Sequence, residues 1–453
     1  MTPWSAAAPC RLGLPRLAAI KGWALVLLVA NTSAQLTWPP ELADHQTHRT
    51  DSSERFLKPT DTLKPGVAIA KTAPTVDFFY FDAQTYEGHP WSVWGDGLVE
   101  GDTFYTSIGD HLAPVGNAFL YAYDSAAKNL RLLTDTRRVL NRPEGWYTPA
   151  KIHSRIDLGK DGWLYFSTHR GSTRATTVEN HFTGGWILRH HPGLGKTEVV
   201  AEAPLPMQTL PTSVLDPDRL IFYAGTADGD HTNKRVQFLA YDLQNRKVLY
   251  SDDQGPARYL IFARSSGRVY FQQSKGAAAP LVRFDPEHPG PPQPIDAVLG
   301  LRSATRETRD HQVYTVDGDA LWAFDTQSET ARALGVLVPG DQTYIASIDL
   351  DPKTERYLYY VPGAHGGGYK DGSPLAQYDL KTGQVKVIAF LHPFYEEEIG
   401  FVPMGSYASD VSPDGSKVYI TWHGNRGGRV RNKLSFNTCA LTVIHIPESE
   451  RKP

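Results

Sequence analysis

One strand–turn–strand motif recurs seven times along the chain, and this repetition constrains the fold more than any other feature. Its first strand is rich in aromatic and β-branched residues and reads "TFYTS", "WLYFST", "RLIFYAG", "RVYFQQ", "QVYTVD", "YLYYVP" and "KVYITW" in turn. The copies follow one another at about 50 residues, which is the period of propeller blades and longer than that of the common helical repeats. We therefore predict an all-β fold, a seven-bladed β-propeller of four-stranded antiparallel blades.

The N-terminal side of the chain supplies a strand that can close this ring. The last copy has three strands and ends soon after "LTVIHIPE", so its fourth strand has to come from elsewhere. The segment "TVDFFYFD" at 75–82 has the composition of a strand, and its pairing would remove an exposed sheet edge. We predict a propeller over 74–453, preceded by a linker or wrapping arm over 35–73. A separate N-terminal β domain is the alternative.

Residues 1–34 have the layout of a secretory signal peptide. Basic residues precede the apolar run "GWALVLLVA" and the small-residue stretch "NTSA", with cleavage expected after Ala34. The apolar run is shorter than the roughly 20 residues that a membrane span requires. We therefore expect a secreted or periplasmic protein without a membrane span.

The composition excludes some partners and some stabilising devices. The whole chain has a formal net charge of −3, and removal of the basic leader makes it more acidic, which argues against nucleic-acid binding. Only Cys439 would remain after cleavage, so no internal disulfide can form. The fold has to be stabilised by packing.

One face of the predicted propeller carries the long loops. Strand direction alternates within a blade, so the loops between second and third strands open on the same side as the connections between blades. Such long loops on a rigid scaffold are expected to carry function. They bring to this face the histidines His111, His153, His169, His181, His231, His365, His392 and His423.

The stretch "KIHSRIDLGKDGWLYFSTHRG" is predicted to be the first hairpin of the second blade. Pairing about its "GKDG" turn sets Asp157 opposite Tyr165 and His153 opposite His169, and directly opposed residues have Cβ atoms about 5 Å apart. We therefore predict that the two histidines are neighbours. His423 occupies the position of His169 in the last blade.

Each of these residues also has a structural interpretation. His153 could bond a backbone carbonyl of the next blade, because buried polar groups need partners. Arg155 and Asp157 could form a structural ion pair. The "HGGG" at His365 could be a turn, and the acidic run 396–398 could be a solvated loop instead of a set of metal ligands.

The residue types on this face suit proton transfer better than acyl transfer, because a histidine pair occurs there without an obvious Ser–His–Asp signature. Elimination from a uronic acid needs a base, an acid and a cation for the carboxylate. We predict that His153, His169 and Tyr344 are catalytic. The substrate-binding candidates are Arg155, Arg170, Arg258, Tyr259, Tyr407 and His365. Convergent imidazoles could instead bind a divalent metal, with His423 as the candidate ligand.

With its blade count, leader and histidine pair, the chain resembles the secreted seven-bladed propeller polysaccharide lyases of the ulvan lyase and rhamnose–glucuronate lyase type. That resemblance implies β-elimination on a uronate-containing polysaccharide or oligosaccharide. Two other classes stay open from the residues alone: a non-catalytic propeller that binds carbohydrate or protein, and a metal-dependent propeller hydrolase or lactonase. The sequence predicts neither the glycan nor the oligomeric state.

Overall fold

A computed structural model describes residues 36–453 except 89, 229–235, 277–278, 428–429, 431, 433 and 453. The predicted signal peptide lies outside the described residues, as does His231. Within the described part of the chain, no helix is both long enough and apolar enough to cross a membrane.

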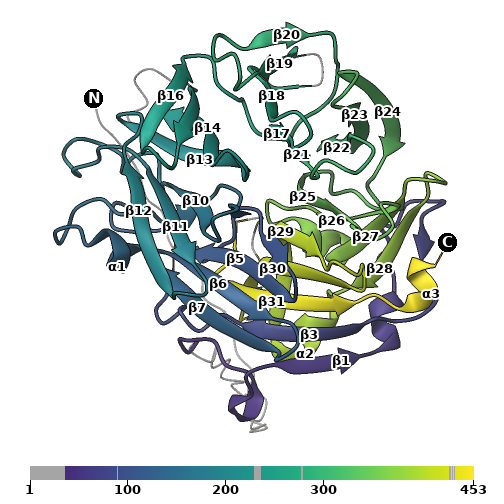
Figure 1. The fold of residues 1–453 in the computed structure, drawn as a ribbon. Coiled ribbons are helices and arrows are strands. Elements are labelled where there is room, and N and C mark those ends of the chain that lie inside the picture. The colour runs from purple at the N-terminus through teal and green to yellow at the C-terminus, as the bar shows by residue number, and fades with distance from the viewer. Residues whose placement is uncertain are drawn as a thin grey trace, which may run out of the picture. The chain divides into compact units, whose positions relative to one another are not determined.

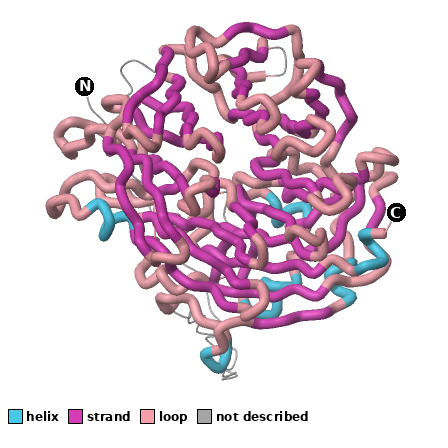
Figure 2. The backbone as a smooth tube through the Cα atoms, in the orientation of Figure 1, coloured by secondary structure: helices cyan, strands magenta, loops and turns pink. Residues whose placement is uncertain are grey.

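The described chain forms seven separate sheets, and the predicted seven-bladed all-β propeller is confirmed. Figure 1 shows the sheets arranged around a common centre, and Figure 2 shows how fully strands account for the backbone. Blades 1 and 2 consist of β4 (Leu98–Glu100), β5 (Thr103–Gly109), β6 (Ala118–Asp124), β7 (Asn129–Asp135), then β8 (Lys151–Ile152), β9 (Asp157–Leu158), β10 (Leu164–His169), β11 (Trp186–His191) and β12 (Lys196–Glu202).

The next four blades each contain four strands of the ring. Blades 3 and 4 consist of β13 (Gln208–Asp216), β14 (Ile221–Asp228), β15 (Phe238–Asp242), β16 (Lys247–Asp252), then β17 (Leu260–Ala263), β18 (Arg268–Gln272), β19 (Leu281–Phe284) and β20 (Gln293–Ile295). Blades 5 and 6 consist of β21 (Ser303–Ala304), β22 (Gln312–Asp317), β23 (Ala320–Asp325), β24 (Thr330–Val336), then β25 (Ile345–Leu350), β26 (Tyr357–Pro362), β27 (Pro374–Asp379) and β28 (Val385–Phe390).

The seventh blade closes the ring with an N-terminal strand, as predicted. Its own strands are β29 (Phe401–Val411), β30 (Lys417–Arg426) and β31 (Thr438–His445), and β3 (Thr75–Tyr80) pairs antiparallel with β31. Because β3 precedes the first blade in the chain, this pairing joins the two ends of the ring. Figure 1 shows the purple β3 beside the yellow β31.

Residues 36–73 run along the outer edges of two blades. β1 (Arg49–Ser52) pairs with β3, and β2 (Ala68–Ile69) pairs parallel with β28. Arg49 and Arg55 form ion pairs with Glu398, and Arg55 also with Glu397, at the end of helix α2. Glu397 and Glu398 therefore hold this segment against α2, and the third residue of the acidic run, Glu396, bonds His392. The helices are η1 (Ala43–His45), η2 (Glu54–Leu57), α1 (Thr136–Leu140), η3 (Gly368–Asp371), α2 (Phe394–Ile399) and α3 (Glu448–Arg451).

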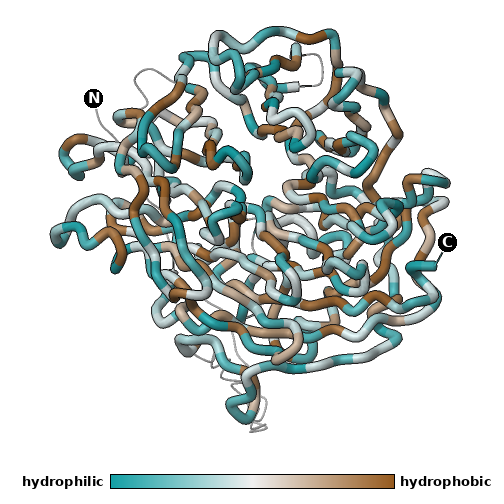
Figure 3. The backbone as a smooth tube through the Cα atoms, in the orientation of Figure 1, coloured by the Kyte–Doolittle hydropathy of each residue, from teal (hydrophilic) through white to brown (hydrophobic). Residues whose placement is uncertain are grey.

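The hydrophobic core lies between neighbouring blades. Seven clusters of buried residues are found in the described chain, and each joins two adjacent blades. In one of them Leu120 of β6 packs with Leu164 of β10, and in another Phe78 of β3 packs with Tyr395 and Trp422. Hydrophobic and hydrophilic segments alternate along the strands in Figure 3, as expected when apolar side chains face the next blade. Seven such layers leave a rigid ring whose inner strands position the site.

Candidate functional site

Side chains from three blades and from three connections between blades converge at the face that carries the long loops. Trp94 is central, with ring centroids 6.0 Å from His153, 5.5 Å from His365 and 5.0 Å from Tyr407. His169 lies 5.2 Å from His153, and Tyr344 lies 5.7 Å from His365. Arg302 joins the group because it is hydrogen-bonded to Tyr344. We call these seven residues the rim cluster: Trp94, His153, His169, Arg302, Tyr344, His365 and Tyr407.

The hairpin that carries the histidine pair departs from the predicted register at its rim end. Near the turn Asp157 pairs with Tyr165 as predicted, but His169 pairs with Lys151 and not with His153. Residues 153–156 form an irregular stretch between β8 and β9. The hydroxyl of Ser154 accepts the backbone N–H of Ser167 at 2.8 Å in place of a ladder bond. This local bulge turns His153 out of the strand while keeping its ring beside His169.

Both histidines of this pair are neutral bases by environment. Burial, followed by the charges of Lys151 and Arg302, lowers the pKa of His153 to about 3. Burial also lowers the pKa of His169 well below its ordinary value. His153 Nδ1 donates to the carbonyl of Pro211 at 2.8 Å, as the structural interpretation expected. Because a carbonyl can only accept, Nδ1 of His153 carries the proton and Nε2 of this ring is unprotonated. The hydrogen bond of His169 to Thr209 leads to the same assignment for the second ring.

Thr209 fixes the tautomer of His169 through two hydrogen bonds. His169 Nδ1 lies 2.9 Å from the hydroxyl of Thr209, and this hydroxyl donates its only proton to the carbonyl of Ala227 at 3.0 Å. The hydroxyl must then accept from His169, so Nδ1 carries the proton. Thr209 and Pro211 lie on β13 of blade 3, and Ala227 lies on β14 of the same blade. The packing of blade 2 against blade 3 therefore sets the tautomers of His153 and His169.

Opposite the histidine pair, a buried arginine activates a tyrosine. The Nε–H of Arg302 donates to the Tyr344 hydroxyl at 2.6 Å, and its guanidinium carbon lies 4.9 Å from that ring's centroid. Burial raises the pKa of Tyr344, but the charge and hydrogen bond of Arg302 outweigh it, so the pKa is lowered overall. Burial instead raises the pKa of Tyr407, whose hydroxyl lies 2.8 Å from His365 Nδ1. Tyr344 is thus the more acidic phenol.

Lys151 is a second buried cation at this face. Its side chain is 8% exposed, and its ammonium lies 4.3 Å from the Trp94 ring centroid. Burial, together with the charge of Arg170, lowers its pKa to about 7. The predicted residue Arg170 directly follows His169 in the chain, and its charge also lowers the pKa of that histidine. Exposed Arg258 lines a cavity of about 150 Å³ that includes Tyr259, Arg302 and Tyr344.

Arg155 lies deeper than the rim. Its guanidinium is 3.5 Å from the Tyr259 hydroxyl, which in turn bonds Asp96, and its Nε is 3.8 Å from Asp157. It also lines a cavity of about 420 Å³ at the turns between first and second strands, with residues such as Lys160. Arg155 thus belongs to an internal charge network that includes the predicted ion pair.

His423 is fully buried and stacks 6.1 Å from Trp94. Burial lowers its pKa to about 3. Among the described residues, no group of three or more His, Cys, Asp or Glu side chains is arranged to hold a metal ion. Of the other rim histidines, His181 stacks on Trp146 and His392 bonds Glu396, both outside the rim cluster.

Sequence reasoning missed Trp94, Lys151 and Arg302. Trp94 lies in the connection between β3 and blade 1, and Arg302 lies in the connection between blades 4 and 5. Each of these connections leads into the first strand of a blade, and this position is the signal from which Trp94 and Arg302 could have been predicted as site residues. Lys151 lies in the predicted hairpin, but a regular register places His153, and not Lys151, opposite His169.

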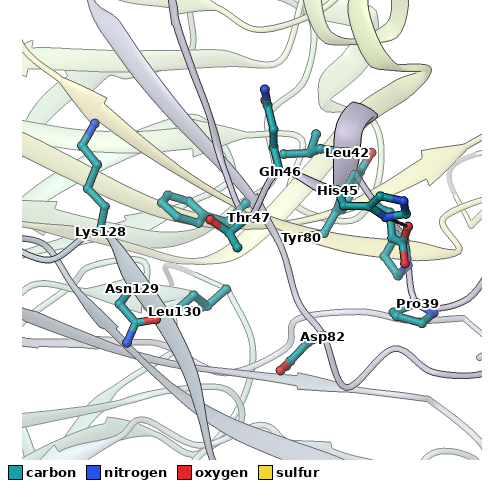
Figure 4. Close-up of a pocket in the computed structure, with 13 residues that line it drawn as sticks. Pro39, Leu42, His45, Gln46, Thr47, Tyr80, Asp82, Lys128, Asn129 and Leu130 are labelled. Carbon is teal, nitrogen blue, oxygen red and sulfur yellow. Dashed lines mark hydrogen bonds and ion pairs between the residues drawn. The ribbon is translucent and has the colours of Figure 1, made fainter.

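A further cavity, of about 330 Å³, lies away from this site. Figure 4 shows its lining: Pro39, Leu42 and His45 from the N-terminal segment face Tyr80 and Lys128 of the ring. It shares no residue with the rim cluster. Its existence follows from the way residues 36–48 cross the edge of blades 7 and 1.

Comparisons with known proteins identify the fold. No family model matches the chain, and no curated protein matches it in sequence. Among solved structures, an oligogalacturonate lyase in complex with manganese aligns with a TM-score of 0.53 and 11% identity, over 90% of this chain and 98% of that one. An oligogalacturonate lyase from Vibrio parahaemolyticus aligns with a TM-score of 0.50 and 9% identity, over 89% and 98%. At such identities the comparison shows a shared propeller fold.

Proposed function

We propose that this protein is an exported lyase that cleaves uronate-containing oligosaccharides or polysaccharides by β-elimination. The observation that carries the proposal is the position of Arg302 between two groups of opposite role. Its Nε–H bonds Tyr344, and its guanidinium carbon lies 5.3 Å from the ring centroid of Tyr407, which lies 6.1 Å from that of His153. A neutral imidazole, a buried cation and an acidified phenol therefore meet in one place, and the solved neighbours include oligogalacturonate lyases.

In this proposal the reaction begins at the carboxylate of the sugar. The C5 proton is acidic only if the negative charge that develops on the carboxylate is stabilised. Arg302 uses one N–H on Tyr344, and its remaining N–H groups can take the carboxylate in a bidentate contact, with Arg258 on the same cavity. Guanidinium charge that is buried and fixed before the reaction stabilises such a state more strongly than water does.

His153 is the proposed base and Tyr344 the proposed acid. An imidazole held neutral by burial has an Nε2 lone pair ready at neutral pH, and His169 lies beside it to share the proton. Tyr344 is protonated but has a conjugate base that Arg302 stabilises, which suits delivery of a proton to the O4 leaving group. The C5–H bond and the C4–O4 bond break, a C4–C5 double bond forms, and two proton transfers balance the step.

The proposal uses arginine charge and no metal. A neighbouring structure contains manganese, but the described residues of this chain do not present a group of three ligand side chains. His423, the predicted ligand, is enclosed behind Trp94 and Phe436, with its ring 4.5 Å from the latter. We therefore assign His423 to packing beneath the rim cluster.

The decisive experiment is to follow the ultraviolet absorbance of unsaturated uronates over a panel of galacturonate- and glucuronate-containing glycans. We expect at least one to be cleaved. His153→Asn and Tyr344→Phe should each lower the rate by about 10²- to 10⁴-fold, the usual contribution of a general acid or base. His181→Asn and Tyr250→Phe are the matched controls, because both residues lie outside the rim cluster. Absence of new absorbance over the whole panel would refute the lyase and favour a binding propeller.

A further inference from the structure

A cavity of about 800 Å³ opens beside the rim cluster. Its walls are the loops that follow β5 and β10, together with the start of the first strand of blade 2. The lining is mostly small or polar and consists of Pro90, His111, Leu112, Ala113, Pro114, Lys151, Gly171, Ser172, Thr173, Arg174, Ala175 and Asn180. This volume exceeds that of a single sugar ring, and the proposed chemistry at Arg302 does not use it.

The cavity shares its inner wall with the proposed catalytic groups. Lys151 and His111 line it, and both contact Trp94, whose ring lies 4.3 Å from the Lys151 ammonium and 5.7 Å from the His111 centroid. The same Trp94 ring stacks 6.0 Å from His153. In addition, Lys151 is paired through the backbone with His169. A chain that has one sugar over His153 can therefore extend its next sugar into this cavity.

Lys151 lacks a carboxylate partner among the described residues. The ion pairs and hydrogen bonds of the described chain do not include its ammonium, and its only close contact of this kind is the face of Trp94. Burial of an ammonium is costly unless an opposite charge accompanies it. A carboxylate bound in the cavity beside Lys151 would supply the opposite charge that the described residues do not provide, and it would favour the charged form of this lysine.

We propose that this cavity is the subsite for a second uronate residue of the substrate, and that Lys151 pairs with its carboxylate. The inference rests on the proposed function, because a uronate oligomer carries one carboxylate on each such residue. Ser172 and Asn180, on the loop after β10, supply polar groups at the wall for sugar hydroxyls. A monomeric uronate would use Arg302 alone, whereas an oligomer would use both cations.

The test is to measure binding of galacturonate, of a galacturonate trimer and of a neutral galactose trimer by calorimetry. All proteins carry Tyr344→Phe, so that the trimer is bound and not cleaved, and the protein with this change alone serves as the wild type for binding. The others add Lys151→Met, Lys151→Gln or the control Lys160→Met, whose lysine lines the separate cavity at the turns between first and second strands. We expect the Lys151 variants to bind the acidic trimer at least tenfold more weakly, to bind the monomer within about twofold of wild type, and Lys160→Met to match the wild type.

Three results separate the possible failures. Equal binding of the acidic trimer by wild type and by both Lys151 variants would overturn the subsite while leaving the proposed function intact. An equal loss for monomer and trimer would place Lys151 at the cleaved sugar and would also overturn it. A wild type that does not prefer the acidic trimer over the neutral one would refute the uronate specificity, and the subsite with it.

Discussion

Replacement of Lys151 by methionine should make the protein more stable at neutral and mildly acidic pH. Burial lowers the pKa of Lys151 from 10.5 to about 7, and each pKa unit corresponds to about 1.4 kcal/mol, so the charged form is penalised by roughly 5 kcal/mol in the folded state. Methionine has a similar length and no charge. It can fill the same space against Trp94 without this penalty.

The sign of the pH dependence follows from proton uptake. Between about pH 7 and pH 10.5 the unfolded chain binds a proton at this lysine and the folded chain does not, so the stability of the wild type rises with pH. Between pH 6 and pH 9 that rise amounts to about 2.7 kcal/mol from this one group. Lys151→Met lacks it, so the stability difference between the two proteins should shrink by that amount as the pH increases.

Urea unfolding at a series of pH values measures this difference. The matched control is Lys160→Met, because Lys160 is exposed and its removal should change stability by less than about 0.5 kcal/mol at every pH. A stability difference between wild type and Lys151→Met that does not change with pH would show that Lys151 is charged and compensated in the folded protein. The reasoning from burial would then be wrong.

Three other outcomes are expected from the same structure. Phe78→Ala should cost about 3 to 5 kcal/mol in urea unfolding, because Phe78 is fully buried on the closing strand, and a cost below 1 kcal/mol would mean that the closing strand contributes little. Hydrogen bonds from His445, Lys128 and Thr50 outweigh burial and lower the pKa of Asp77, so its carboxylate stabilises the wild type at neutral pH and this stability is lost as the pH falls below about 4. Asp77→Asn should lack this contribution at every pH, and acid unfolding curves of the two proteins that coincide would contradict the expectation. Arg302→Gln should raise the pKa of Tyr344, measurable by ultraviolet titration of the phenol against Tyr344→Phe, and an unchanged titration would refute the role of Arg302.

The ring could be predicted from the sequence because each blade repeats the same information. The aromatic and β-branched strand recurs at a constant period, and the missing fourth strand of the last copy has one evident source at 75–82. The site could be predicted only in part. His153 and His169 are close because one hairpin carries both, which is a local property. Arg302 comes from the connection between blades 4 and 5 and contacts Tyr344 and Tyr407, and a repeat does not show which residues of distant blades face one another across the ring.

The register predicted from regular pairing is wrong near His153, because His169 pairs with Lys151 instead. The physical reason can be tested. Ser154 is buried, and its hydroxyl accepts the Ser167 N–H at 2.8 Å, so the two strands separate where regular pairing would continue. Ser154→Ala should leave that N–H without a partner and cost about 1 to 3 kcal/mol. Because the bulge also aims His153, the variant should lose lyase activity beyond any loss of folded protein.

Ser412→Ala is the matched control for this variant. Ser412 is likewise buried and accepts the Lys417 N–H at 2.9 Å, but it lies at the turn between β29 and β30, at the far end of those strands from His423. It should cost a similar free energy of unfolding and leave the activity of the folded enzyme unchanged. If both variants lose activity only in proportion to stability, the bulge serves folding and does not orient His153, and the assignment of His153 as the base would have to rest on its own substitution alone.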